Sequence, residues 1–227
     1  MIKMNIEGID FHWLGHDSFL IQAKGKNIYI DPYKLTKKDL PEADIIITTH
    51  DHFDHCNPEA IEQICGEKTI LVGPKVTIDK LNDISKKKKV IELNPYDEKE
   101  IDGIKISAIP AYNTHRFRDP ETKTPFHPKE SGHIGPIIDV DGVKIYHAGD
   151  TDKIPEMEDL KPHIALIPVS GTYVMDVPEA VEAAKVISAK ITIPMHVGRG
   201  IGELSYREEF KEKLENMEVI LLDLEES

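Results

Sequence analysis

Residues 50–55 read HDHFDH, which brings three histidines and two aspartates into six positions. The whole chain has 11 histidines among 227 residues, so this density is far above chance. Neutral imidazole is the commonest ligand of zinc and related ions, and a carboxylate adds charge and a bridging oxygen. The run therefore predicts a metal-binding loop. On it His50 and His52 can converge on one ion, while Asp54 and His55 face a second.

Two later segments place similar residues after expected strands. Asp150 follows the small residues Ala148 and Gly149, which let a ligand approach closely, so it could bridge two metal ions or serve as a turn residue. His196 follows another apolar segment, where a lone histidine is more often structural. Because ligands bind at the carboxyl ends of strands in α/β sheets, the joint occurrence of the three segments favours a single cleft.

The elements that must position these residues follow from the hydrophobic pattern. The run Asp44 to Thr48 is continuously apolar and predicts a buried strand that leads into the histidines. Asn57 and Pro58 then have the types expected at the N-cap and first position of a helix. Further strands are expected at 11–21, 27–30, 69–72, 90–93, 104–110, 135–140, 143–147, 164–169, 191–195 and 219–224, and further helices at 76–84, 178–188 and 206–214.

This alternation predicts two βα halves packed sheet against sheet, with helices outside, as a single domain over 1–227. Asp141-Gly142 is a strong hairpin turn signal between two of the strands. The polar segment between Tyr112 and Gly135 is long for a connection inside a compact domain, and such segments are usually functional or mobile.

Composition narrows the classes of function. The net charge of −13 argues against nucleic acid as a partner. No apolar run reaches the roughly 20 residues that a membrane span needs, and the N-terminal residues do not resemble a signal peptide. Cys56 and Cys65 are too few for a disulfide framework, so we expect reduced thiols and a cytoplasmic protein. We expect a small-molecule substrate. An anionic substrate stays open, because a dimetal centre would bring positive charge to an acidic protein. A homo-oligomer also stays open, since an acidic surface does not forbid a symmetric assembly.

The motifs resemble those of the metallo-β-lactamase fold superfamily. The resemblance rests on HxHxDH at 50–55, HAGDT at 147–151 and PMH at 194–196, with support from WLGHDSF at 13–19, IDP at 30–32, IPAYN at 109–113 and IPVSG at 167–171. The chain is most similar to the branch of metal-dependent hydrolases that includes the ascorbate-6-phosphate lactonase and N-acyl-phosphatidylethanolamine phospholipase D types. The match runs from about residue 11 to residue 200.

The resemblance implies a mixed α/β (α+β) fold, a four-layer αββα sandwich, with two divalent metal ions at one edge. It implies metal ligands at His50, His52, Asp54, His55, Asp150 and His196, with Asp150 bridging. It also implies that Asp54 can accept a proton from the nucleophilic water. His16 and Asp31, with Ser18, would lie near the site and orient ligands or contact substrate.

One position departs from the superfamily pattern. Many relatives have a histidine ligand where this chain reads Ala111-Tyr112-Asn113, and an asparagine is a poor zinc ligand. Asn113 is therefore expected to support the site or contact substrate, and another residue must replace the histidine. We favour His127 as the ligand. His115, closest in sequence, and His133 are the alternatives.

The leading hypothesis is a hydrolase that uses a metal-activated water on a small ester, lactone or phosphodiester. Arg116, Arg118 or Lys129 could bind an anionic substrate group or be solvated charges. The competing hypotheses are a metal- or ligand-binding module without turnover and a di-iron redox enzyme on the same fold. Di-iron relatives usually carry an acidic residue where this chain has His52, which favours zinc, with manganese and iron as alternatives.

Overall fold

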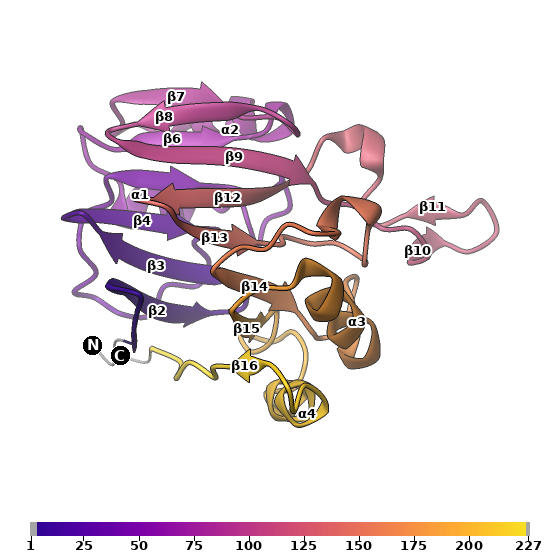
Figure 1. Ribbon diagram of the computed structural model, residues 1–227. Coiled ribbons are helices and arrows are strands. Elements are labelled where there is room, and N and C mark those ends of the chain that lie inside the picture. The colour runs from indigo at the N-terminus through magenta and orange to yellow at the C-terminus, as the bar shows by residue number, and fades with distance from the viewer. Residues whose placement is uncertain (1–3, 226–227) are drawn as a thin grey trace. The chain divides into compact units, whose positions relative to one another are not determined.

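Two seven-stranded β-sheets organise the computed structural model, which describes residues 4–225 (Figure 1). Each sheet belongs to its own compact unit. Unit 1 runs to Asn94 and takes in the C-terminal segment from Leu222, and unit 2 is Pro95–Leu221. Because the end of the chain returns to unit 1, the two units are not simply consecutive in sequence. The single domain expected over 1–227 stays a prediction.

The sheet of unit 1 is antiparallel at one side and parallel at the other. Its strands lie in sequence order: β1 (Met4–Ile6), β2 (Ile9–Gly15), β3 (Ser18–Ala23), β4 (Lys26–Ile30), β5 (Ile45–Ile47), β6 (Ile70–Gly73) and β7 (Lys89–Glu92). Pairing is antiparallel from β1 to β4 and parallel from β4 to β7. All three residues of β5 are buried, as its apolar sequence predicts for a strand covered on both faces.

Helices pack on one face of this sheet. They are α1 (Pro58–Ile64), the short 3₁₀ turn η1 (Lys75–Thr77) and α2 (Ile78–Asp83). The side chain of Asn57 caps α1 by accepting the N–H of Ala60, and Pro58 occupies the first turn, which confirms the predicted helix start. Ile61 and Ile64 join one hydrophobic core with sheet residues such as Ile46. This packing fixes the β5–α1 loop, on which residues 50–55 lie.

The sheet of unit 2 follows the same plan of pairing. Its order is β16 (Glu218–Val219), β15 (Ile191–Met195), β14 (Ile164–Pro168), β13 (Val143–His147), β12 (Ile134–Val140), β9 (Ile104–Pro110) and β8 (Glu98–Ile101). Strands β8, β9, β12 and β13 pair antiparallel, and β13 to β16 pair parallel. Helix α3 (Val177–Ile187) contacts β14, and α4 (Ser205–Lys213) contacts β15.

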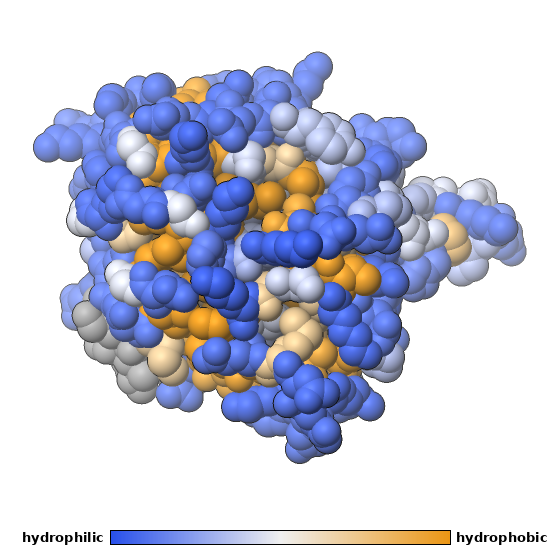
Figure 2. All heavy atoms as spheres, viewed as in Figure 1, coloured by the Kyte–Doolittle hydropathy of each residue, from blue (hydrophilic) through white to orange (hydrophobic). Residues whose placement is uncertain are grey.

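The long segment between β9 and β12 is folded. It contains a two-stranded hairpin, β10 (Phe117–Asp119) with β11 (Thr124–Pro125), and the 3₁₀ turn η2 (Lys129–Ser131); a further 3₁₀ turn, η3 (Pro155–Met157), follows β13. The hairpin stands clear of the rest of unit 2, and its surface is mostly hydrophilic (Figures 1 and 2). Its base is closed by a hydrogen bond from the backbone N–H of Asn113 to the carbonyl of His127. This closure carries His127 back towards the ends of β9 and β13.

Two of the predicted strands differ in the structure, and one strand of the unit 2 sheet was not predicted. The strand expected over 11–21 is two strands, because Gly15 and His16 adopt left-handed backbone angles (φ 97° and 55°) and reverse the chain. The strand β8 was not expected, since its sequence, EKEI, has one apolar residue. The strand expected over 219–224 is divided: β16 ends at Val219, and Leu224 pairs with Trp13 of unit 1 instead. The Asp141-Gly142 turn is confirmed, with positive φ at both residues.

Candidate metal centre

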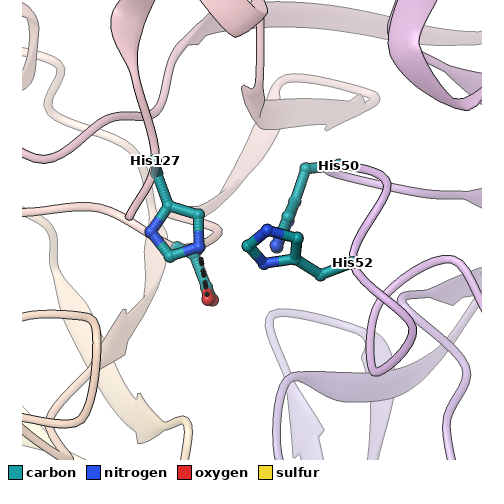
Figure 3. A group of neighbouring side chains, drawn as sticks. His50, His52 and His127 are labelled. Atoms are coloured by element: carbon teal, nitrogen blue, oxygen red, sulfur yellow. Dashed lines mark ion pairs between the residues drawn. The ribbon is translucent and has the colours of Figure 1, made fainter. Parts of the chain in front are cut away.

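The histidine run follows β5 and ends just before α1. The rings of His50 and His52 lie 4.6 Å apart edge to face, and the rings of His50 and His55 lie 4.0 Å apart. Figure 3 shows the side chains of His50 and His52 on this loop. His50 and His55 are fully buried. Phe53, in contrast, is 65% exposed and contacts the ring of Tyr33. The loop therefore gathers its imidazoles and turns the phenylalanine outwards. We call His16, Asp31, His50, His52, Asp54 and His55 the loop cluster.

Asp31 supports this loop from the end of the neighbouring strand β4. Its carboxylate accepts hydrogen bonds from the backbone N–H of Thr49 (2.7 Å) and from the Thr49 hydroxyl (2.6 Å). It also lies 2.8 Å from Nδ1 of His55. A carboxylate can only accept, so His55 carries its proton on Nδ1 and keeps Nε2 for a metal.

Thr49 orients His50 in the same way. The single hydroxyl proton of Thr49 goes to Asp31, so the Thr49 oxygen accepts from Nδ1 of His50, 3.0 Å away. Metal ligation by His50, as predicted, would therefore use Nε2. Sequence analysis missed this role of Thr49, because a threonine beside a ligand carries no distinguishing pattern.

His16 lies closer to the ligands than an orienting role requires. Its Nε2 atom is 3.3 Å from Nε2 of His55 and 3.4 Å from Oδ2 of Asp54. The left-handed backbone of His16, at the turn between β2 and β3, directs the ring there, and the indole N–H of Trp13 donates to its carbonyl. Such strain in a non-glycine residue is common at functional sites. His16 is thus within direct reach of an ion bound by Asp54 or His55. The neighbouring Asp17 is also fully buried and was not among the predicted site residues.

In unit 2 the corresponding cluster is centred on Asp150, which follows β13. Its Oδ2 atom lies 3.3 Å from Nε2 of His127, and its Oδ1 atom lies 3.3 Å from Nε2 of His196; the dashed line in Figure 3 marks the pair formed by His127. All three side chains are at least 96% buried. We call these three residues the aspartate cluster. Each carboxylate oxygen of Asp150 faces one imidazole nitrogen.

The far nitrogens of the two histidines are also held. Nδ1 of His127 lies 2.9 Å from Oδ1 of Asn113, and Nδ1 of His196 lies 2.8 Å from the hydroxyl of Ser170, just after β14. His196 itself has a left-handed backbone (φ 61°) directly after β15. Sequence analysis named Ser170 only as part of a motif and did not assign it this contact.

The two alternatives to His127, namely His115 and His133, also lie in unit 2. The side chain of His115 is 57% exposed and contacts Asp152 and Glu179 instead of Asp150. His133 is buried beside His127, with the two ring centres 5.7 Å apart. Of the three candidates, His127 is the one for which the described residues show an ion pair with Asp150.

His115, Asp152 and Glu179 are close enough together to hold a cation, but Arg116 already fills that place. Its guanidinium contacts Asp152 at 2.6 Å and also Glu179. Burial acts to raise the pKa of Asp152, but the N–H groups of His115 and Thr114 and the charge of Arg116 outweigh it and hold that pKa below its usual value. Arg116 is therefore committed to an internal ion pair.

Two further residues that could bind an anionic substrate group, Lys129 and Arg118, have other partners. Lys129 pairs with Glu156 and lies over the ring of Tyr112. Arg118 lies 5.9 Å from the ring centre of Phe126.

Both cysteines are free and buried, and burial raises the pKa of the Cys56 thiol to about 12.

Comparison with known proteins identifies the family. Residues 10–196 match the family described as the beta-lactamase superfamily domain. A UPF0173 metal-dependent hydrolase from Thermoplasma volcanium is 35% identical over 198 residues, which cover 81% of this chain and 81% of that protein. Another from Thermococcus onnurineus is 32% identical over 234 residues, which cover 94% of this chain and 96% of that protein.

Solved structures agree. A proposed metal-dependent hydrolase from Parabacteroides distasonis superposes with a TM-score of 0.82 at 31% identity, over 98% of both chains. A metallo hydrolase from the archaeon Ignicoccus hospitalis has the same fold, with a TM-score of 0.76 at 24% identity over 96% of both chains. The chain therefore belongs to the metallo-β-lactamase superfamily and, within it, to the UPF0173 family of metal-dependent hydrolases.

This result confirms the superfamily resemblance, the mixed α/β metallo-β-lactamase-like fold and the assignment as a metal-dependent hydrolase. The donor set fits metal dependence, because the histidine and aspartate side chains form groups that could hold a metal ion. Within the described residues, no helix combines the length and the apolar character that crossing a membrane requires. The roles of the individual site residues stay predictions. The structure gives the distances between their side chains within each unit.

Proposed function

We propose that the ligands predicted from the sequence hold two divalent metal ions and that the protein hydrolyses a small ester, lactone or phosphodiester. The observation that carries this proposal is the geometry of Asp150, whose two carboxylate oxygens each face one imidazole nitrogen at 3.3 Å. A carboxylate that presents one oxygen to each of two sets of ligands is suited to bridge two ions. Zinc is the proposed metal, with manganese and iron as alternatives.

The proposed ligands are those predicted from the sequence, namely His50, His52, Asp54, His55, His127, Asp150 and His196. When bound, a pair of divalent ions supplies a nucleophilic water near neutral pH and polarises the oxygen of the scissile group. Support for this ligand set comes from the hydrogen bonds through which Thr49 and Asp31 engage Nδ1 of His50 and His55, so that ligation would use Nε2. Membership of a family of metal-dependent hydrolases supports the reaction type.

In this proposal Asp54 accepts the proton of the attacking water at a carboxylate oxygen. Its side chain is 14% exposed, so it can be reached from solvent, and its Oδ2 atom lies 3.4 Å from Nε2 of His16. His16 can therefore share that proton or bind an ion beside Asp54. The substrate is proposed to be a small molecule, since a deep carboxylate and buried imidazoles are reached most easily by a small group.

The protein is proposed to act in the cytoplasm. Support comes from its two cysteines, which are both free and buried, as is usual where thiols are kept reduced.

The test begins with metal analysis of the purified full-length protein by inductively coupled plasma mass spectrometry. The same protein is then assayed on matched panels of lactones, esters and phosphodiesters. We expect one panel to be cleaved and Asp54→Asn to lower kcat at least 100-fold, in the range of a lost general base. Asp51→Asn is the matched control, because it makes the same chemical change on the same loop at a residue with no assigned role.

Two results would overturn the proposal. Stoichiometric metal with no cleavage on any panel, together with an Asp54→Asn variant that behaves as wild type, would favour a binding module. Bound iron with turnover of an oxidisable substrate and no hydrolysis would favour the redox alternative.

A further inference from the structure

Asn113 occupies the place where the superfamily pattern leads one to expect a histidine ligand, and its side chain makes four hydrogen bonds. Its Oδ1 atom accepts from the backbone N–H of His127 and lies 2.9 Å from Nδ1 of the same residue. Its Nδ2 group donates to Asp152 Oδ1 at 3.0 Å and to the carbonyl of Tyr173 at 2.9 Å. An amide has two donors and two acceptor sites, so this side chain is fully used.

These contacts allow one orientation of the amide. The carboxylate of Asp152 and the carbonyl of Tyr173 can only accept, so they require the NH₂ group on their side. The backbone N–H of His127 can only donate, so it requires the oxygen on its side. Flipping the amide would place oxygen against two acceptors and nitrogen against a donor. The orientation of Asn113 is thus determined by groups whose roles are known.

The fixed oxygen in turn determines the state of His127. Because Oδ1 of Asn113 can only accept, Nδ1 of His127 must carry a proton. The Nε2 atom, which lies 3.3 Å from Oδ2 of Asp150, then carries either a lone pair or a second proton that a divalent ion displaces. In both cases Nε2 is the atom that faces Asp150. A proton on Nδ1 defines the tautomer that ligation through Nε2 requires.

Asp152 is itself anchored from several sides. Its Oδ2 atom accepts from the backbone N–H groups of Thr114 (2.7 Å) and His115 (3.0 Å), and Arg116 contacts its Oδ1 atom at 2.6 Å. Arg116 also contacts Glu179, which lies at the start of α3. The orientation of His127, on the long segment between β9 and β12, is therefore tied to residues of the helix-bearing part of unit 2.

We infer that Asn113 is a positioning residue that holds His127 in the Nδ1–H tautomer, with Asp152 fixing the amide. Asn113, which stands where a histidine ligand is expected, thus orients His127, the residue proposed as the ligand instead. This inference rests on the proposed function only in taking His127 as a metal ligand. Asn113 itself is not expected to touch metal or substrate.

The test compares three variants of the full-length protein, Asn113→Ala, Asn113→Asp and His127→Ala, with His115→Ala as the matched control. His115 is adjacent and also contacts Asp152, so its removal perturbs the same surroundings without touching His127. Two quantities are measured on zinc-loaded protein. One is zinc retention against a graded chelator. The other is the slowly exchanging imidazole Nδ1–H resonance, identified by its loss in His127→Ala.

We expect Asn113→Ala to weaken zinc retention about 10- to 100-fold and to lose the resonance, as for other partners of metal-bound histidines. Asn113→Asp still offers His127 an acceptor oxygen. A proton shared between the new carboxylate and Asp152 replaces the lost Nδ2–H donor. This variant should therefore keep the resonance and most of the zinc. A purely structural role predicts the reverse order, because a second carboxylate beside Asp152 would do more harm than alanine. His115→Ala should match wild type.

The outcomes separate the inference from the proposed function. If Asn113→Ala retains zinc within twofold of wild type while His127→Ala loses it, His127 stays a ligand and the inference fails. If His127→Ala retains its zinc, the proposed ligand itself is wrong. Should Asn113→Ala not fold, Asn113→Asp decides, since loss of the Nδ1–H resonance in folded Asn113→Asp overturns the inference.

Discussion

Unit 1 and unit 2 share one plan of strand pairing, four antiparallel strands followed by three more in parallel, but they use equivalent strand ends differently. In unit 1 the strand at which the pairing changes, β4, is followed by Asp31, which contacts His55 directly and His50 through Thr49. In unit 2 the equivalent strand, β13, leads to Asp150, which faces two histidines itself. Asp31 thus supports two of the proposed ligands, whereas Asp150 is itself a proposed ligand.

The loop and aspartate clusters also differ in how they are assembled. Four of the six residues of the loop cluster lie within residues 50–55, so local chain geometry brings them together. The three residues of the aspartate cluster come from the ends of two strands and from a long connection, 69 residues apart from first to last. The comparison teaches that a cluster built from one loop is visible in sequence, whereas one built from distant segments depends on supporting hydrogen bonds.

The largest effect is expected for Asp150→Asn. The amide loses the charge that can bridge two ions, so the bound metal of the purified protein should fall to near zero while the fold is kept. Mass spectrometric metal analysis and circular dichroism check this. Asp139→Asn is the matched control, because its oxygen can still accept the N–H of Gly142. If Asp150→Asn retains all of its metal, the proposed difference between Asp31 as a supporting residue and Asp150 as a ligand is wrong.

The next effect is expected for Asp31→Ala, which should reduce stability more than metal content. Three donors in the buried core of unit 1 lose their acceptor, and breaking such a buried charged network costs about 3–5 kcal/mol. Urea unfolding measures the loss of unfolding free energy, and zinc retention should fall about 10-fold. Asp39→Ala, at an exposed position, is the control. An unchanged urea midpoint would show that Asp31 does not support the loop.

A smaller effect is expected for the paired variants Thr49→Val and Ser170→Ala, which each remove a hydroxyl beside Nδ1 of a histidine. Thr49 also donates to the buried carboxylate of Asp31, whereas the second bond of Ser170 is a longer one, accepted from the N–H of Thr172 at 3.2 Å. Thr49→Val should therefore cost about 1–3 kcal/mol of stability and Ser170→Ala less than about 1 kcal/mol. Thermal unfolding and chelator competition compare them. Equal losses of stability in the two variants would contradict the expectation that the Thr49 hydroxyl stabilises unit 1 more than the Ser170 hydroxyl stabilises unit 2.

The smallest effect concerns Glu225, which ties the C-terminal segment to unit 1 through Lys37 and His12. Burial acts to raise the pKa of Glu225, but Lys37 and His12 outweigh it and hold the pKa below its ordinary value of 4.5. A carboxyl whose folded pKa is lowered stabilises the fold above the unfolded pKa, and this stabilisation disappears as the pH falls through the folded pKa. Glu225→Gln should therefore cost about 1 kcal/mol at pH 7 and progressively less as the pH falls towards 3.

Urea unfolding at both pH values checks the effect of Glu225, with the exposed Glu121→Gln as the control. A cost that is the same at pH 7 and pH 3 would mean that the charge of Glu225 contributes nothing.

Much of the fold could be predicted from the sequence, because strong local signals coincide with tertiary structure. The strands at β9, β13 and β15 match the expected ranges, and Asn57 caps its helix as expected. The failures have physical causes. The turn at His16 depends on a left-handed backbone in a residue that rarely adopts one, and β8 forms by pairing with β9 despite its polar sequence.

By itself the sequence determined the chemistry that is available: imidazoles and carboxylates at the ends of apolar strands, in a pattern shared with metal-dependent hydrolases. Only the tertiary structure decided which histidine of the long connection faces Asp150 and which nitrogen it presents. The physical reason is that sequence spacing limits only how far a residue can reach. The amide of Asn113, oriented by Asp152 and closing the base of the hairpin, is what directs His127 inwards.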